Sequence, residues 1–353
     1  MKSQQALDKS SCEKAKEFVV HHGESEYELS RFLHFHPGGF NTLLRFEDRD
    51  IAGKMRTTQH SQAAHYLMEE YRRSVTNNAS HDLEKLVDWS KPMLWQVGHL
   101  GKRYQEWVSS PVDRRLRLFQ SNFVESISVT PWYIVPIFWI PILLTVLIQG
   151  YWDNYSYIKQ DSLAFLWFMA CFFLGVVLWS LMEYSIHRWV FHHHPPEDSF
   201  TLITLHFLLH GLHHKVPFDS QRLLFPPVPA ALLGALAYSL IRMLTPLWML
   251  HFMAAGIITG YITYDLIHFY LHYGSPKAHT YFYHMKRYHN QHHFAHHDSV
   301  SPCDEWSEGV ACRVSWYMQF SGFDRLVCNN TFWLNEESNE KLPHSLFRLF
   351  STT

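Results

Sequence analysis

Residues 162–195 read SLAFLWFMACFFLGVVLWSLMEYSIHRWVFHHHP, an apolar run that leads straight into a group of histidines. No charged residue occurs from Ser162 to Met182, and a run of this length is enough to cross the hydrocarbon core of a bilayer as a helix. His187 and His192 follow soon after the run ends. The stretch therefore predicts a membrane helix that delivers metal-binding side chains to the membrane surface.

Three further segments have the length and composition of membrane spans. They cover residues 131–150, 223–241 and 243–264, and we expect the last two, which only Arg242 separates, to form a hairpin. Four spans return the chain to its starting side. The excess of basic residues beside the spans marks that side as cytosolic; these residues are Arg114, Arg115, Arg117, Arg188 and Lys215. Both termini and all the histidine groups are therefore predicted to face the cytosol.

Ten of the 27 histidines form four closely spaced groups. The groups are His187 and His192; His210, His213 and His214; His268 and His272; and His289, His292 and His293. Residues three or four apart share one face of a helix, so such spacing aims several imidazoles at one point. Zinc is usually satisfied by four ligands and an octahedral metal by six. Ten imidazoles therefore predict two metal ions that keep some coordination positions open.

Other polar side chains flank these groups without the paired spacing. We expect the flanking histidines to support the ligands or to face solvent; they are His193, His194, His206, His284, His296 and His297. Glu183 lies four residues before His187, and Asp265 three before His268. Each carboxylate is placed either to hold the second ring nitrogen of a ligand or to cap a helix end.

Composition restricts the class of protein further. The formal net charge is −2 with histidine neutral, which gives no indication of nucleic-acid binding. The five cysteines show neither paired nor CxxC spacing, as expected for a reducing cytosolic environment. The polar N-terminus, MKSQQALDKS, lacks the apolar core of a cleavable signal.

The polar N-terminal region contains YELSRFLHFHPGGF followed by TTQHSQAAHYL. The motif His36-Pro37-Gly38-Gly39, with His60-Ser61 after it, resembles the haem-binding domain of the cytochrome b5 family. The resemblance implies that His36 and His60 are the axial ligands of a haem b, with His65 as the competitor for the second position. Two histidine ligands leave the iron no open position, so this domain is expected to carry electrons.

An electron carrier joined to an all-histidine membrane site favours iron, because zinc has no redox chemistry. Zinc also binds imidazole well, and we expect it to compete for the site in isolated protein. The whole pattern resembles the fatty acid 2-hydroxylases. The matching stretches are KPMLWQVG, EYSIHRWVFHHHP, HFLLHGLHHKVPFD, RLLFPPVPA, YDLIHFYLHYG and MKRYHNQHH.

This resemblance implies that the ten grouped histidines bind two irons and that O₂ supplies the oxygen inserted at C2 of a long acyl chain destined for sphingolipids. It also implies electrons from an NAD(P)H-dependent reductase through the haem, and an endoplasmic reticulum location. Two alternatives remain: a sterol or other lipid oxidase or desaturase of the same superfamily, and a non-enzymatic carrier of metal or haem.

The expected fold is mostly α, with a small α+β haem domain before a four-span membrane domain capped by a cytosolic His-rich helical region. We assign residues 17–73 to the haem domain, 74–128 to a linker with a segment lying along the membrane surface, and 129–299 to the hydroxylase domain. Residues 300–353, beginning VSPCDEWSEGVACRVSWYMQFSGFDRLVCNN, depart from the family pattern and form an atypical tail.

Overall fold

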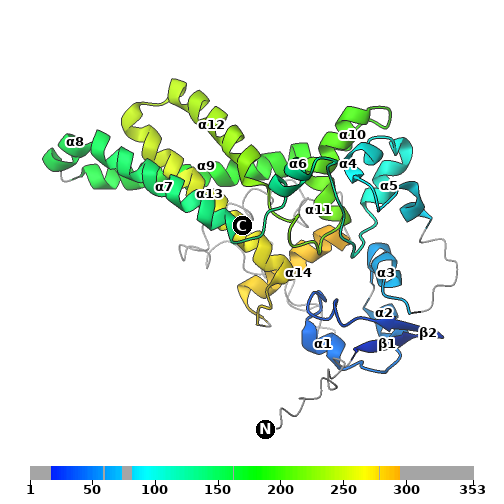
Figure 1. Cartoon of the computed structure of the whole chain (residues 1–353). Coiled ribbons are helices and arrows are strands. Elements are labelled where there is room, and N and C mark those ends of the chain that lie inside the picture. The colour runs from blue at the N-terminus through cyan, green and yellow to red at the C-terminus, as the bar shows by residue number, and fades with distance from the viewer. Residues whose placement is uncertain (1–16, 59, 74–81, 162, 278, 295–353) are drawn as a thin grey trace, which may run out of the picture.

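The computed structural model describes residues 17–58, 60–73, 82–161, 163–277 and 279–294. The tail assigned to residues 300–353 lies outside them, as do His296 and His297. The fold is mostly helical, with one small sheet near the N-terminus and a bundle of long helices, as Figure 1 shows. This is the fold class expected from the sequence.

The N-terminal domain is a small α+β unit. Strands β1 (Val19–His22) and β2 (Ser25–Glu28) pair antiparallel, and three short helices, α1 (Phe40–Leu44), α2 (Ala52–Thr57) and α3 (Gln62–Glu69), follow. Its apolar core includes Val20, Tyr27 and Leu67. The Ser61 side chain caps the start of α3 by accepting a hydrogen bond from the amide of Ala64, which fixes the chain just after His60.

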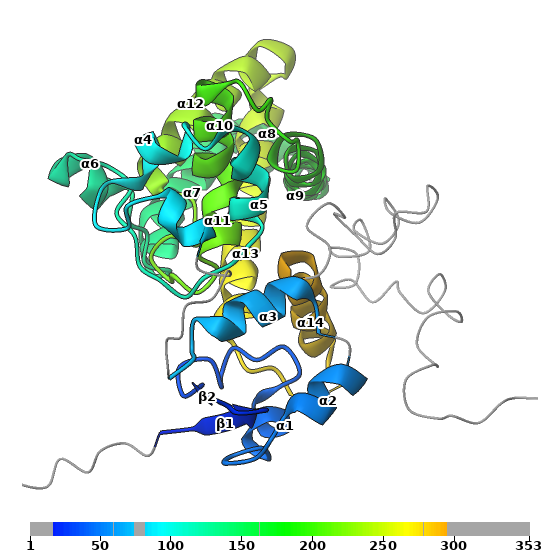
Figure 2. The same cartoon turned by 90° about the vertical axis from the view of Figure 1, so that its right-hand side faces the viewer.

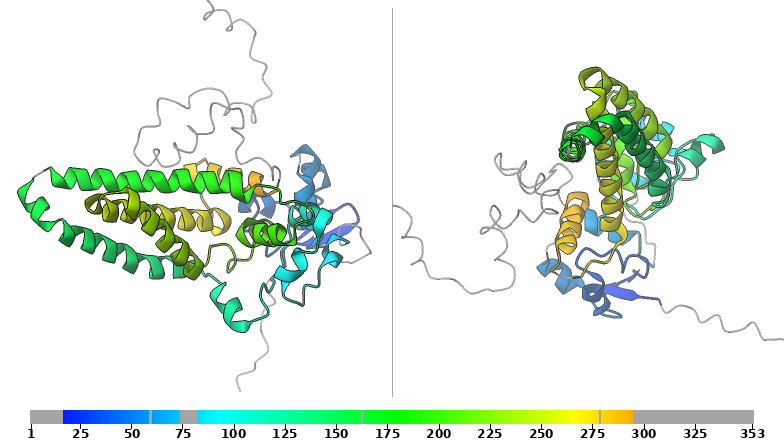
Figure 3. Two further views of the ribbon diagram at one scale, coloured as in Figure 1. Left: turned by 90° about the horizontal axis from the view of Figure 1, so that it is seen from above. Right: turned by 90° about the vertical axis from the view of Figure 1, so that its left-hand side faces the viewer.

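Four helices are long and apolar enough to cross a membrane, in agreement with the four predicted spans. They are α7 (Ile134–Asp153), α9 (Ala164–Ile186), α12 (Pro227–Leu244) and α13 (Leu247–Tyr273). Seen from above in Figure 3, α7 and α9 flank α12 and α13. A short helix, α8 (Tyr155–Gln160), joins α7 to α9. The chain is thus a multi-pass membrane protein.

The fourth span is longer than its hydropathy suggests. It was predicted to end at Tyr264, but α13 continues to Tyr273. The continuation contains Asp265 and His272, which lower the apolar average but are buried against neighbouring elements. Packing therefore stabilises α13 beyond Tyr264, where its composition is no longer typical of a membrane span.

Helices α9 and α13 approach each other closely at two glycines. A Cβ atom added at Gly175 would lie 2.1 Å from the carbonyl oxygen of Met253, and one added at Gly256 would lie 1.9 Å from that of Phe172. Only residues without a side chain permit such backbone contact, which is a common way for membrane helices to pack. The contact fixes α13, and with it the ligands at its end, against α9.

The segment predicted as a linker is partly a packed unit. Residues 82–128 contain α4 (Met93–Val97), α5 (Tyr104–Val108) and α6 (Asn122–Ile127), with short 3₁₀ turns at Leu83–Leu86 and Gly101–Arg103. Tyr104 and Trp107 are fully buried and pack with Ile203 and Phe207, which lie about a hundred residues farther along the chain. The sequence was interpreted as a linker because it is polar, and as an interfacial segment because it mixes Trp, Pro and basic residues. Trp95 and Phe123 stay exposed, so a location at the membrane surface remains a prediction.

The site-bearing elements lie between the bundle and the haem domain. They are η4 (His187–Phe191), α10 (Phe200–His206), η5 (Phe207–Gly211), α11 (Leu212–Lys215) and α14 (Tyr281–Phe294). Figure 2 shows α3 of the haem domain beside α14, and these two helices are in contact. The two halves of the chain therefore meet next to the histidines.

Candidate metal centre and haem site

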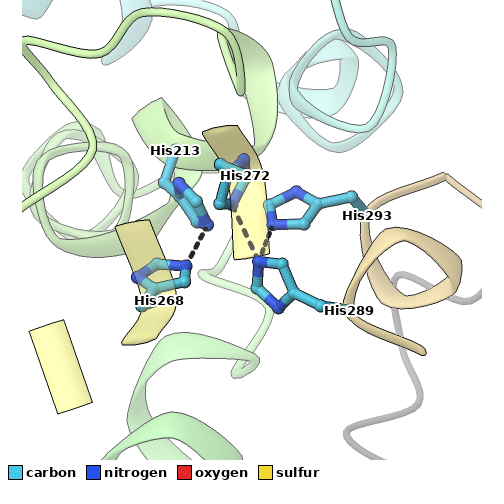
Figure 4. Close-up of side chains that lie close together, drawn as sticks. All are labelled: His213, His268, His272, His289 and His293. Atoms are coloured by element: carbon cyan, nitrogen blue, oxygen red, sulfur yellow. Dashed lines mark hydrogen bonds between the residues drawn. The ribbon is translucent and has the colours of Figure 1, made fainter. Parts of the chain in front are cut away.

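The structure collects nine of the ten grouped histidines into two clusters. In each cluster, one ring nitrogen from every residue lies within 4.8 Å of the others. Cluster one is His213, His268, His272, His289 and His293, and cluster two is His187, His192, His210 and His292. Figure 4 shows the rings of cluster one facing a common centre. They come from α11, α13 and α14.

The remaining histidine, His214, lies between the clusters. Its Nε2 atom is 2.8 Å from Nε2 of His210, and its ring centroid is 4.5 Å from that of His293. Its position suits a fifth ligand of cluster two. All ten histidines predicted as ligands therefore converge, although they come from segments separated by about a hundred residues.

The nitrogen spacings fit metal ions better than hydrogen bonds. His210 Nε2 lies 3.2 Å from Nε2 of His192 and 2.8 Å from that of His214. His289 Nε2 lies 2.8 Å from Nε2 of His272 and 3.1 Å from that of His293. A neutral nitrogen carries one hydrogen or one lone pair, so it cannot form two good hydrogen bonds. Ligands about 2.0–2.1 Å from an octahedral metal are about 2.9 Å apart, close to these values.

Two π-helical turns present three of the four histidines of cluster two, and the fourth, His292, comes from α14. In η4 the amide of His192 donates to the carbonyl of His187, a contact between residues five apart. The same geometry occurs in η5, which contains His210. An α-helix would turn residues five apart away from each other, whereas a π turn brings them to one face. The HxxxxH spacing of His187 and His192 is the sequence signal for this feature.

Burial keeps the imidazoles in the form that binds metals. It lowers the pKa of His210, His213, His289 and His293 well below the usual value, and the charges of neighbouring histidines lower it further. These rings are therefore neutral at pH 7 and offer lone pairs.

One large apolar cavity reaches both clusters. Its volume is about 1580 Å³, and its walls come from the four long helices, including Trp139, Leu233 and Ile258. At one end it is lined by histidines of both clusters, namely His187, His210, His213, His268, His289 and His292. The cavity exceeds the roughly 300–1,000 Å³ of common ligand pockets. A long apolar molecule can therefore lie along it with one end against the metal ligands.

The two predicted haem ligands are held in similar ways. Nδ1 of His36 is 3.3 Å from the carbonyl oxygen of Gly39, and Nδ1 of His60 is 3.3 Å from that of Met55. Nδ1 of His60 also lies 2.9 Å from the hydroxyl of Thr58. In both rings Nδ1 is thus occupied by protein partners, which leaves Nε2 available for iron. Burial lowers the pKa of His36, and the nearby charge of His60 lowers it too. His65 is exposed. These features favour His60 over His65 and fit a haem.

The tight turn after His36 requires its glycines. A Cβ at Gly38 would lie 2.8 Å from the His36 ring, and Gly39 has a φ of +91°, where other residues are strained. The PGG sequence therefore shapes the space beside the first ligand.

The flanking residues have varied roles. His193 and His194 are exposed, as expected, whereas His284 lines the cavity. His206 lies 2.5 Å from the hydroxyl of Tyr104 through Nδ1. Asp265 is buried and Glu183 borders the cavity, but their predicted hold on ligand nitrogens stays a prediction.

A buried lysine beside the ligands was missed by the sequence analysis, which assigned Lys215 only to a membrane flank. Its side chain is 0% exposed, and Nζ lies 2.6 Å from Glu84 and 4.5 Å from the centre of the Trp107 ring. Burial lowers its pKa to about 8, although Glu84 acts in the opposite direction. Its distant partner, more than a hundred residues away, left no signal in the sequence.

Comparison with known families divides the chain in two. Residues 3–76 match the cytochrome b5-like heme/steroid binding domain, and residues 172–325 match the fatty acid hydroxylase family. The second match extends beyond Ser299, where the tail was predicted to begin.

Similar proteins agree with this division. The chain is 39% identical over 324 residues to the fatty acid 2-hydroxylase of Homo sapiens, covering 79% of this chain and 86% of that protein. It is 40% identical over 220 residues to a dihydroceramide fatty acyl 2-hydroxylase of Arabidopsis thaliana, covering 59% of this chain and 84% of the relative. These names support neither a sterol oxidase nor a non-enzymatic carrier.

A solved structure described as full length scs7p, in which only the hydroxylase domain is visible, shares the fold of the membrane part. It aligns with a TM-score of 0.54 and 29% identity, over 70% of this chain and 90% of that chain. With a cytochrome b5-like domain, a fatty acid hydroxylase domain and relatives of 39% identity, the chain belongs to the fatty acid 2-hydroxylase family.

Proposed function

We propose that this enzyme is a di-iron monooxygenase that hydroxylates C2 of long-chain fatty acyl groups destined for sphingolipids. The observation that carries the proposal is the apolar cavity that ends on histidines of both clusters. The names of the relatives support the substrate and the position of attack, because they are fatty acid and dihydroceramide acyl 2-hydroxylases.

The reaction inserts one oxygen atom of O₂ into a C–H bond and reduces the other to water, which consumes two electrons and two protons. Irons bound at the two clusters supply the redox change that this chemistry needs and that zinc lacks. The ten ligands proposed for them are His187, His192, His210, His213, His214, His268, His272, His289, His292 and His293.

The protein positions the acyl chain and excludes water from it. The apolar side chains of the four long helices line the cavity, so they can hold an acyl chain that enters from the bilayer without exposing it to water. The histidine end of the cavity then lies beside C2 when the polar end of the substrate stays at the membrane surface. The buried imidazoles at this end of the cavity are neutral, so they add no charge beside the acyl chain.

Electrons reach the site from an NAD(P)H-dependent reductase through a haem b held by His36 and His60. The haem supplies one-electron transfer, and its two histidine ligands leave no position for O₂. We further propose that the protein resides in the endoplasmic reticulum membrane, with the haem domain, both termini and the metal clusters on the cytosolic side. The basic residues around Arg114 support this orientation.

The test is mass spectrometry of lipids from cells that express the chain. We expect 2-hydroxy acyl groups to appear in sphingolipids, and the His213→Ala variant to lose them. The matched control is His193→Ala, because His193 is exposed and lies outside both clusters. Oxidised sterols without 2-hydroxy acyl lipids would contradict the proposal.

Metal analysis tests the identity of the ions. Purified active enzyme should contain about two metal ions per chain, as the ligand count implies. Its activity should follow the iron content across preparations. Full hydroxylation by enzyme that holds only zinc would disprove the di-iron chemistry.

A further inference from the structure

Two phenylalanines of the haem domain contact the hydroxylase domain directly. Phe32 and Phe35 precede His36 and pack on Phe218, which follows α11, with ring centroids 5.9 and 5.1 Å from the centre of its ring. The Phe32 ring also lies 6.0 Å from that of His36. The side of the haem domain that contains its first ligand therefore faces the metal clusters.

The aromatic contacts continue to the metal ligands. The Phe218 ring stacks on Phe294 at 6.1 Å and 17°, and Phe294 adjoins His293 in the sequence. The Phe35 ring lies 5.4 Å from Tyr273, the neighbour of His272. Ring-to-ring contact thus extends from His36 to two ligands of cluster one.

Paired charges hold the same interface. Glu70, at the end of α3, accepts two hydrogen bonds of 2.7 Å from Arg114. Asp113 accepts one from Tyr71 at 2.9 Å and one from Arg31 at 3.1 Å. The carboxylates of Glu70 and Asp113 are only 8% and 7% exposed. Buried carboxylates are costly unless paired, so these contacts specify one orientation of the haem domain.

A third contact links the haem domain to the buried lysine. The hydroxyl of Tyr66, on α3, donates to Glu84 at 2.5 Å, and Glu84 pairs with Lys215, the residue after His214. Helix α3 also contacts α14, as Figure 2 shows. The interface therefore touches the hydroxylase domain at several points around the clusters.

We propose that Phe32, Phe35 and Phe218 form the docking contact through which electrons pass within one chain, and that the Glu70–Arg114 and Asp113 contacts position it. The inference rests on the electron relay of the proposed function. A haem held by His36 and His60 would give up one electron in each passage, changing from the ferrous to the ferric state, and a metal centre held by the two clusters would accept it. Two passages supply the two electrons of one hydroxylation. The rate of electron transfer falls steeply with distance. The ring contacts favour transfer because they hold the haem domain close to cluster one.

A photo-crosslinker tests the docking contact in the full chain. With benzoylphenylalanine in place of Phe35, irradiation should join this position to the peptide that contains Phe218 or Tyr273, as mass spectrometry would show. The control position is Glu24, in the β1–β2 turn, because the hairpin lies away from α14 in Figure 2. Crosslinks from Phe35 to a second copy of the chain, or to neither peptide, would overturn the proposal.

Charge reversal tests the positioning role of Arg114. We expect R114E to slow reoxidation of the pre-reduced haem by O₂ about tenfold, since it removes two charge-assisted hydrogen bonds. Adding E70R should restore most of the rate by re-forming the pair. The matched control is R115E, because Arg115 is the exposed neighbour. An unchanged rate in R114E, or no rescue in the double variant, would contradict the proposal.

These outcomes separate the docking from the chemistry. The crosslink requires neither metal nor lipid substrate, and haem reoxidation is followed by the haem spectrum. A chain that forms the crosslink but makes no 2-hydroxy lipids would disprove the proposed function and leave the docking intact. A chain that makes them without the crosslink or the rescue would disprove only the docking.

Discussion

Single ring nitrogens determine what each histidine does in this enzyme. In the metal clusters the close contacts run between Nε2 atoms, as between His289 and His272. In the N-terminal domain Nδ1 of His36 and of His60 contacts a backbone carbonyl, which leaves Nε2 for the proposed haem iron. The identity of the residue predicts a ligand, whereas its hydrogen bond to the backbone selects the nitrogen that is used.

The haem ligands can be tested by substitution in the full chain. His36→Ala and His60→Ala should each abolish the low-spin haem spectrum, because each removes one of the two axial nitrogens. His65→Ala is the control, since His65 is exposed and should leave the spectrum intact. Loss of the spectrum in His65→Ala with retention in His60→Ala would reverse the assignment.

His206 should contribute to acid sensitivity. Burial lowers its pKa to about 4, below the ordinary 6.5. The unfolded chain therefore binds a proton between these values that the folded chain does not, so stability falls as pH drops from 6.5 to 4. Because His206 is partly exposed, we expect it to reduce the free energy of unfolding by about 2 kcal/mol over this pH range.

Replacing His206 with Asn tests this effect by denaturant unfolding in detergent at several pH values. The variant should be less stable at pH 7, because the contact with Tyr104 is altered. Its stability should also decline less between pH 6.5 and 4 than that of the natural chain. Parallel declines in the two proteins would contradict the assignment to His206.

For the helices, the sequence correctly predicted the features that depend on local composition alone. The four spans were found because apolar runs are a local property. The extension of α13 to Tyr273 was not, because Asp265 and His272 are tolerated only through burial against other segments. The π turn at His187 was also missed, because His187 and His192, five residues apart, were grouped with histidines three or four apart that share one face of an α-helix.

The contact between α9 and α13 should be intolerant of any side chain. Gly256→Ala places a Cβ within 1.9 Å of the Phe172 carbonyl, so the helices must separate. Overpacking of this kind costs about 1–3 kcal/mol. The control is Gly234→Ala in α12, where the nearest atom, on Trp139, is 3.8 Å away. Thermal unfolding in detergent should show a lower midpoint only for Gly256→Ala.

At the scale of the whole molecule, the haem domain and the metal clusters meet across one interface. The sequence predicted both parts and the need for them to share one side of the membrane. It did not predict the orientation, because Glu70 and Arg114 pair across two domains and neither residue is unusual by itself. Docking depends on tertiary contacts that a single sequence does not display.

Sealed microsomes can test whether the haem domain and the metal clusters lie on the same side of the membrane. Tags at both termini should be accessible to protease from outside, because four spans return the chain to the cytosol. Glycosylation at Asn154 is a poor reporter, since that side chain is buried and donates to the carbonyl of Gly150. Protection of either tag would require an odd number of spans and would place the haem and the metals on opposite sides.

The length of α13 bears on which carbon atom is attacked. His268 lies twenty-one residues beyond Leu247, where the helix begins, so it stands about 32 Å along the axis at 1.5 Å per residue. The hydrocarbon layer of a bilayer is about 30 Å thick. With Leu247 at the opposite face of the bilayer and the helix upright, the proposed metal centre would lie at the level where acyl chains join their head groups. In the proposed function, a helix of this length would hold the metal centre at the depth of the first carbons of the acyl chain, and the distant methyl end would lie too far away to react.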